Sequence, residues 1–404
     1  DLVGFGIVIP LLTFYAEDYQ ATPVQVTLLM AVYSLAQFAF APLWGGLSDR
    51  VGRRPVLLVS LTASTLFLAG FAAAQQLWLL FLFRTLHGAA AANLSTAQAC
   101  VADLTTPENR AKGMGLIGAA FGVGFTVGPF IGGELSRFGG HATPIWFAAG
   151  LSAVNLVLAL WLLPETRRPG SRTRPRPVDP RVFLRVCRHP LVGGCVLLTF
   201  VLTASFSLVE STFTLFAEHL RGLDAPGVGR MFGIAGLATI VVQGGLIQPL
   251  VRRYGEGRLV SVGIAILGIA IVLLPYAPPF GAMLAVFIAM AVGQGIATPS
   301  LQSLISRSTP EDEQGLVLGT NQSMSALARA VAPAGSGLVY AHVAPQAPFL
   351  LAGAILVGGF VLSIFAVARI RSGQVDDPPG DEDLGSAGPC ELVQISFSET
   401  RTAE

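Results

Sequence analysis

The feature that most constrains the fold of this chain is a series of twelve apolar stretches. Each is close to the ~20 residues that an α-helix needs to cross a bilayer. Only 12% of the residues are charged, against about 25% in a soluble domain. The sequence therefore predicts an all-α membrane protein with twelve transmembrane helices. The stretches run over residues 1–16, 24–46, 55–74, 77–101, 111–137, 143–163, 190–217, 226–250, 258–276, 280–305, 315–340 and 346–369.

Two six-helix halves are expected from a repeat in the sequence. Thr106-Pro107-Glu108 recurs as Thr309-Pro310-Glu311, and Ala16-Glu17 returns as Ala217-Glu218. Pro129 and Gly133 recur as Pro333 and Gly337. Matching features at corresponding places are typical of duplicated transporters, whose substrate path lies at the seam between the repeats. We expect one bundle over 1–163, its first helix truncated at the start, an Arg- and Pro-rich linker over 164–189, a second bundle over 190–370, and a disordered acidic tail over 371–404.

Basic residues gather on one side of the predicted spans. The loop after the second stretch, the linker and the loop around Arg252 and Arg253 are rich in arginine, whereas the first loop on the other side carries Glu17 and Asp18. The positive-inside rule then places the linker and both termini in the cytoplasm. We expect a multi-pass monomer in the plasma (inner) membrane, surrounded by lipid.

Composition also excludes several classes of protein. A net charge of +1 argues against nucleic acid as a partner. The only lysine, Lys112, is followed by glycine and not by Ser or Thr, so the chain has no Walker A loop and is not expected to use ATP. No cluster of metal ligands and no nucleophile–base set is evident. The sequence predicts neither an enzyme, nor a metal site, nor a cofactor other than protons as a coupling ion.

The loop between the second and third stretches carries a distinctive motif. Between the second and third stretches stands Gly45-Gly46-Leu47-Ser48-Asp49-Arg50-Val51-Gly52-Arg53-Arg54. This segment resembles the signature of the major facilitator superfamily. The resemblance implies the fold of that family and a latch, made with Asp49 and Arg53, that holds the two halves together on the cytoplasmic side. A simple positive anchor is the alternative, but an anchor needs no carboxylate and no paired glycines. The candidate latch residues are Gly45, Asp49, Arg50, Gly52, Arg53 and Arg54.

The fifth stretch carries a second pattern. Glycines four residues apart form a flat face on a helix, and this face lets a neighbouring helix approach closely. The whole pattern resembles the motif that marks the drug:H+ antiporters of the superfamily, the multidrug and tetracycline type, and so implies antiport. Ordinary packing of small residues is the alternative. The residues of the pattern are Gly115, Gly124, Gly128, Pro129, Gly132 and Gly133.

Three ionisable residues in the spans are candidates for proton coupling: Asp1, Glu210 and Arg84. Each charge costs ~2.5–3.5 kcal/mol at the bilayer centre, which favours a functional reason for keeping it. Asp1 begins Asp-x-x-Gly-x-Gly-x-x-x-Pro, which resembles the first-helix motif of the same antiporters. Glu210 lies on a polar stripe of its helix, although a carboxylate neutralised by a neighbouring helix is the alternative.

Further polar residues at membrane depth are candidates for lining a substrate cavity: Gln37, His87, Gln294, Gln322 and Arg329. Together these features predict alternating-access export of a small amphipathic or drug-like solute in exchange for protons. An uptake symporter or facilitator for a sugar or other metabolite on the same fold is the alternative. A receptor or scaffold without transport activity would not need charges at membrane depth in several helices.

Overall fold

The computed structural model describes residues 2–105, 107–166, 192–278, 280–309 and 314–371, and nearly all of them are helical. The first half (residues 2–166) contains α1 (Leu2–Glu17), α2 (Pro23–Val51), α3 (Arg53–Ala72), α4 (Leu77–Ala90), α5 (Leu94–Leu104), α6 (Pro107–Gly139) and α7 (Ala142–Leu162). The second half (residues 192–371) contains α9 (Val192–Arg221), α10 (Ala225–Val241), the π-helical turn η1 (Val242–Leu246), α11 (Ile247–Tyr254), α12 (Glu256–Leu273), the 3₁₀ turn η2 (Leu274–Tyr276), α13 (Gly281–Arg307), α14 (Gln314–His342) and α15 (Ala347–Arg371).

Ten segments among the described residues are long and apolar enough to cross a membrane. Helices α4 and α5 count as one such segment, as do α10, η1 and α11. Helix α1 is apolar but has only 16 residues, and α14 is not among the ten. Of the expected tail, residues 372–404 lie outside the described residues, as do residues 167–189 of the expected linker and Asp1.

The fourth apolar stretch forms one membrane-spanning segment, as predicted, but a short break divides its helix. Helix α4 ends at Ala90 and α5 begins at Leu94. Three successive carbonyl oxygens at this break accept side-chain hydrogen bonds from neighbouring helices: Trp44 donates to Ala89 (2.7 Å), Ser60 to Ala90 (2.8 Å) and Gln37 to Ala91 (3.2 Å). Because a bilayer offers no water to a free carbonyl, these donors make the break possible.

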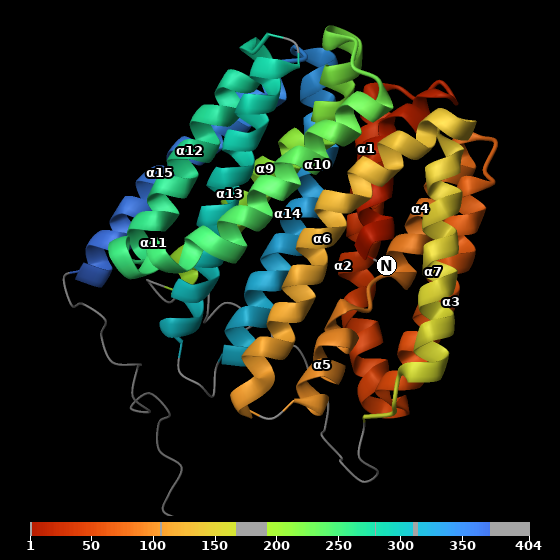
Figure 1. The fold of residues 1–404 in the computed structure, drawn as a ribbon, viewed down its shortest axis with the longest axis horizontal. Helices are drawn as coiled ribbons and strands as arrows, with labels where there is room; N and C mark the ends of the chain where they lie inside the picture. Colours follow the sequence, from red (N-terminus) through yellow and green to blue (C-terminus); the bar gives the residue numbers. More distant parts are fainter. Residues whose placement is uncertain (1, 106, 167–191, 279, 310–313, 372–404) are drawn as a thin grey trace, which may run out of the picture.

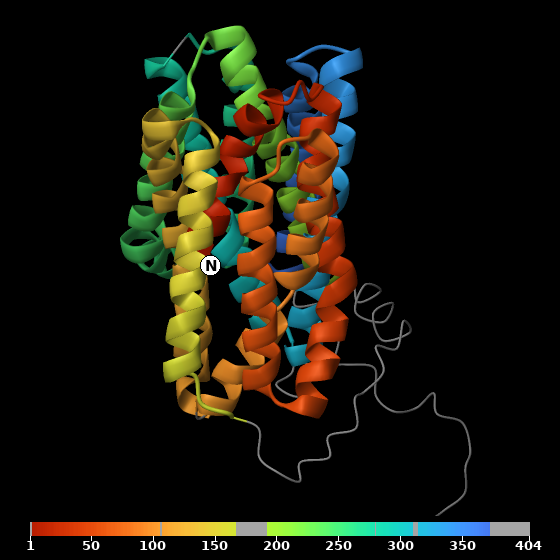
Figure 2. The ribbon, with the colours of Figure 1, turned by 90° about the vertical axis from the view of Figure 1, so that its right-hand side faces the viewer.

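The two halves meet through two equivalent pairs of crossing helices. Helix α2 packs against α14, and α6 packs against α10, where the halves meet (Figure 1). Figure 2 shows α10 (green) on the left and α14 (blue) on the right of the molecule. A Cβ added to Gly133 of α6 would lie 2.8 Å from the carbonyl oxygen of Ala225, at the start of α10. A Cβ added to Gly337 of α14 would lie 3.1 Å from the Cα of Val24, at the start of α2. Gly133 and Gly337 occupy equivalent positions in the sequence repeat. Each crossing therefore depends on a glycine at the same position of its half.

Capping fixes where α2 and α10 begin at these crossings. Thr22 and Gln25 form a capping box at the start of α2, with Pro23 as the first helical residue. Asp224 accepts the N–H of Gly227 (2.9 Å) at the start of α10. Such caps satisfy the amide groups that lack partners in the first turn of a helix.

The halves are joined at one end of the molecule, here called the closed end. Two ion pairs cross between the halves there: His219 Nε2 lies 3.0 Å from Glu17 Oε1, and Arg230 Nε lies 2.7 Å from Glu134 Oε1. At the opposite, arginine-rich end, which carries residues 50–54, no ion pair among the described residues joins the halves.

Exposure along the central helices follows the same division. Residues 225–229, at the closed end of α10, are all buried, whereas residues 243–246, in η1 directly after α10, are all exposed. In α2, only Leu35 is exposed between residues 23 and 36, whereas Phe40, Leu43 and Leu47 are all exposed further along. The halves therefore pack tightly at the closed end and separate toward the arginine-rich end.

The glycine face of α6 packs against α1. A Cβ on Gly124 would lie 2.6 Å from the carbonyl oxygen of Leu2, and one on Gly128 would lie 2.7 Å from the carbonyl carbon of Gly6. The close approach predicted from glycines four residues apart is confirmed, and the neighbour is α1. Gly122, on another face of α6, has no atom within 4 Å of such a Cβ.

We expect Gly128→Ala to destabilise the protein, because the added methyl group would meet the backbone of α1, which cannot move aside as a side chain can. Overpacking of this kind costs about 1–3 kcal/mol. Gly122→Ala makes the same chemical change on the same helix in open space and is the matched control. Thermal unfolding of the purified proteins in detergent measures both, and equal transition temperatures for the two variants would contradict the packing described here.

Candidate functional site

A pocket with about 360 Å³ of empty space, including the part open to solvent, lies at the seam between the halves. Helices α1, α2 and α4 of the first half and α9 and α14 of the second half contribute to its wall. Phe5, Ile9, Met30 and Pro333 supply apolar surface.

Three charged side chains that the sequence singled out converge on this pocket. Arg84 reaches it from α4, Glu210 from α9 and Arg329 from α14. The first half thus contributes one basic side chain, and the second half one acidic and one basic side chain. Asp1, the remaining ionisable candidate, lies outside the described residues.

Arg84 is held by an aromatic ring. Its side chain is only 2% exposed, and its guanidinium carbon lies 4.2 Å from the centre of the Tyr33 ring. Its Nε and Nη1 atoms are buried and find no hydrogen-bond partner among the described residues. A cation–π contact offsets part of the cost of burying a guanidinium group but leaves its N–H donors free. Arg84 therefore presents unused donors at the wall of the pocket.

Glu210 lies in a similar position on the other side. Its Oε1 atom is buried and accepts no hydrogen bond from the described residues. Ser207 and Ser211, one turn before it and one residue after it, also line the pocket, and Ser211 hydrogen-bonds with Ser336 of α14 at 2.7 Å. The polar stripe predicted on this helix thus reaches the pocket at Ser207 and Glu210.

The other predicted cavity residues do not line this pocket. Gln37 donates to the carbonyl of Ala91 and so belongs to the helix break described above. His87 is buried with its ring centre 5.4 Å from that of Tyr33, behind the pocket wall. Gln294 is half-buried on α13, and Gln322 is exposed on the part of α14 nearer the arginine-rich end. Of the five cavity candidates, only Arg329 is brought to the pocket.

The arginine-rich loop forms a polar network at the other end of the first half. Arg53 pairs with Asp49 (2.6 Å) and with Asp103 at the end of α5 (3.3 Å), and it donates to Ser48 (2.6 Å). All the partners found for Arg53 among the described residues belong to the first half, including Glu165. The structure thus shows contacts of Asp49 and Arg53 within one half only, and their predicted latch between halves stays a prediction.

Glu165 completes this network by capping α3. Its two carboxylate oxygens accept the backbone N–H groups of Arg53 (3.0 Å) and Arg54 (3.2 Å), the first residues of α3. A negative charge at a helix N-terminus is favourable because the free N–H groups there carry partial positive charge. Gly52 has φ +117°, a backbone conformation that favours glycine, and a Cβ there would lie 2.6 Å from Glu165 Oε2, so a larger residue would also displace the capping carboxylate.

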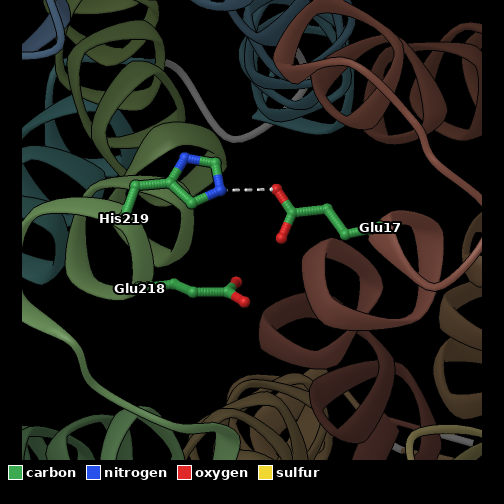
Figure 3. A group of neighbouring side chains, drawn as sticks. All are labelled: Glu17, Glu218 and His219. Atoms are coloured by element: carbon green, nitrogen blue, oxygen red, sulfur yellow. Dashed lines mark ion pairs between the residues drawn. The ribbon is translucent and has the colours of Figure 1, made fainter.

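A further group of polar side chains lies at the closed end. Glu17 from α1 and Glu218 and His219 from α9 turn their functional groups toward one another (Figure 3). This cluster cannot be recognised from spacing along the chain, because Glu17 and Glu218 are 201 positions apart. The repeat of Ala16-Glu17 as Ala217-Glu218 was the available signal, since a duplicated fold brings equivalent positions face to face.

Comparison with known proteins decides the family. The model of the Major Facilitator Superfamily matches residues 1–256 and 242–399. The chain belongs to the major facilitator superfamily. It is 33% identical to the class C tetracycline resistance protein of Escherichia coli, over 84% of this chain and 87% of that protein. It is 25% identical to multidrug resistance protein 2 of Bacillus subtilis, over 90% of this chain and 91% of that protein.

A solved structure supports the same assignment. The crystal structure of the human organic anion transporter MFSD10 superposes with a TM-score of 0.70 at 26% identity, covering 90% of this chain and 96% of that one. The resemblance of the sequence motifs to the multidrug and tetracycline-type members is confirmed. This superfamily member is a multi-pass membrane protein with a largely helical fold.

The facilitator fold explains where the glycine motif lies. Gly124 and Gly128, together with Gly132, face α1, whereas Gly133 faces α10 across the seam. For Gly115 the structure describes only the helical course of α6. The motif therefore packs one helix against a neighbour in each half.

We expect Glu165→Ala to lower the free energy of unfolding by about 0.5–2 kcal/mol, the usual cost of losing a helix cap. Glu165→Gln keeps one carbonyl oxygen as an acceptor and should lie between the wild type and the alanine variant. Thermal unfolding in detergent measures the series. An unchanged transition in Glu165→Ala would show that the cap contributes nothing to stability.

Proposed function

We propose that this protein is a secondary active transporter that exports a small amphipathic or drug-like solute in exchange for protons by alternating access. The observation that carries the proposal is the pocket at the seam of the halves, where Glu210 meets Arg84 and Arg329. Its position between the repeats is where transporters of this kind bind their substrates. The relationship to tetracycline and multidrug resistance proteins supports a drug-like solute.

We further propose that the membrane domain has twelve spans in two six-helix bundles. Helices α1 and α14 would join the ten apolar segments to complete this number, since α1 packs against α6 and α7 of the first half and α14 packs against α9 of the second half (Figure 1). Under the positive-inside rule the arginine-rich end and both termini lie in the cytoplasm. The structure then corresponds to a state that is closed to the outside and open toward the cytoplasm, where it would collect its solute.

Proton flux and solute flux would be coupled because a proton and a guanidinium group compete for the carboxylate of Glu210. A protonated Glu210 is a poor partner for the guanidinium group of Arg329, whereas the ionised form attracts it. Protonation would therefore change the balance of charge in the pocket and with it the affinity for solute, and a ligand shifts a conformational equilibrium only through such a difference in affinity. Asp1, on the first-helix motif, is a second candidate for the proton.

The charge of the pocket favours a solute with an acidic group. Two guanidinium groups face a single carboxylate there, and Arg84 keeps buried donors unused. Guanidinium groups bind carboxylates and similar anions through paired hydrogen bonds. The human protein MFSD10, to which this chain is similar, is an organic anion transporter, which agrees with this preference.

The alternative is uptake of a sugar or other metabolite on the same fold. The antiporter motif on α6 and the resistance proteins among the relatives favour export. Counterflow in vesicles separates the two, since an exporter exchanges solute against an inward proton gradient. A compound panel tested for growth inhibition, with and without expression, would identify the solute. We propose no enzymatic activity and no cofactor other than protons.

We expect Glu210→Gln to abolish exchange driven by a pH gradient while the protein still folds, because an amide cannot take up and release a proton. Glu256→Gln is the matched control: Glu256 pairs with Arg307 (3.3 Å) and lies outside the pocket. Proteoliposomes with an imposed pH gradient measure the exchange. Transport at the wild-type rate in Glu210→Gln would remove this residue from the coupling mechanism.

We expect Asp49→Asn to shift the population further toward the state open at the arginine-rich end. The change removes the carboxylate that lies 2.6 Å from Arg53 and so weakens the network from which the proposed latch is built. Labelling of a single cysteine placed at this end of α2 reports accessibility. Asp18→Asn, the same change at the closed end, is the control, and equal labelling in both variants would count against the latch.

A further inference from the structure

The closed end brings together three side chains of the kind that bind transition metals. Glu17 is the last residue of α1, and Glu218 and His219 lie in the last turn of α9. Their potential ligand atoms all lie within 4.8 Å of one another. Figure 3 shows the two carboxylates and the imidazole arranged around a common space. One ligand belongs to the first half and two belong to the second.

An ion pair alone does not account for the whole group. His219 Nε2 lies 3.0 Å from Glu17 Oε1, and this contact uses one carboxylate. Glu218 remains: its Oε2 atom is buried and finds no hydrogen-bond partner among the described residues. Two carboxylates side by side repel unless a proton or a cation lies between them. When both carboxylates are ionised, the arrangement therefore has one negative charge more than a protonated His219 can balance.

The cations on the elements around the group are engaged elsewhere. His141, at the start of α7, lies 2.8 Å from Asp18, the neighbour of Glu17. Arg221, two residues after His219, donates to the carbonyl of Pro275 at 2.6 Å. Both cations thus have partners of their own, although His141 is also close enough to act on Glu218 electrostatically.

We propose that Glu17, Glu218 and His219 bind a Zn²⁺ ion at the closed end. An imidazole with two carboxylates is a ligand set that Zn²⁺ accepts, with Zn–N and Zn–O distances of about 2.0–2.2 Å and water in the fourth position. Ligand atoms within 4.8 Å of one another reach such distances by rotation of the side chains. The imidazole favours Zn²⁺ over Mg²⁺ or Ca²⁺, which prefer oxygen ligands.

Because the site lies across the seam, a bound ion would affect transport. This part of the proposal rests on the proposed function. The ion would tie the end of α1 to the end of α9, across the seam. Release of solute at this end requires the two helix ends to separate. A ligand that binds only the closed form shifts the equilibrium toward it, about a hundredfold when its concentration is a hundred times its Kd. External Zn²⁺ would therefore inhibit export.

Binding is tested first, without reference to transport. ZnCl₂ is added to the purified full-length protein, and bound metal and thermal unfolding are measured, with MgCl₂ as a comparison. We expect Zn²⁺ to bind and to raise the unfolding temperature. Glu17→Gln, Glu218→Gln and His219→Asn should each weaken binding at least about tenfold, since even loss of an outer-shell partner costs 10–100-fold.

Asp18→Asn is the matched control, since it removes the same charge one residue away from Glu17 without removing a ligand. Its unfolding temperature without metal, compared with those of the ligand variants, shows that each protein is folded. We expect Asp18→Asn to keep the affinity of the wild type. No binding of Zn²⁺ by the wild type, or equal binding by all three ligand variants, would overturn the site.

Transport is tested second, in proteoliposomes with a pH gradient and ZnCl₂ on the side of the closed end. We expect inhibition in the wild type and in Asp18→Asn, and its loss in the three ligand variants. Zn²⁺ that binds at the three residues but leaves exchange unchanged would overturn the inhibitory role. If no exchange occurs in any sample, the proposed function fails, while the binding measurement still decides the metal site.

Discussion

A bilayer supplies neither hydrogen bonds nor a high dielectric, so every polar group within it needs a partner from the protein or a place beside water. The structure of this superfamily member follows from that constraint. Most of its length satisfies it through regular helices. Where the backbone departs from a helix, between α4 and α5, side chains from α2 and α3 replace the lost hydrogen bonds. Where charges remain at depth, at Arg84, Glu210 and Arg329, they gather around one pocket.

The duplicated architecture organises the contacts between the halves. Gly133 and Gly337 make equivalent crossings at the closed end, and each allows a backbone to come close. Glu17 and Glu218, which the repeat also relates, meet at that end between the halves. Duplication thus produces complementary packing where the equivalent residues are glycines. It produces a concentration of like charge where they are acids.

Much of this arrangement was predictable from sequence, because the strongest signals are local. Hydropathy located the ten apolar segments found among the described residues, and the glycines four residues apart on α6 predicted its close packing. The charges at membrane depth predicted the pocket residues Arg84, Glu210 and Arg329. Residues whose role depends on distant partners were missed or misplaced. Gln37 was expected in the cavity, yet its partner is a carbonyl 54 positions away. Glu165 caps a helix that begins 112 positions before it. Neither relationship leaves a pattern along the chain.

The break between α4 and α5 gives this half of the molecule a joint. Arg84 lies on one side of it, and Asp103, the partner of Arg53, lies on the other. Side-chain donors can change partners as they rotate, whereas the hydrogen bonds of a continuous helix must break together. The helix that brings Asp103 to the arginine-rich network is thus separated from the helix that carries Arg84 to the pocket, and side chains of α2 and α3, rather than a continuous helical ladder, hold the two together.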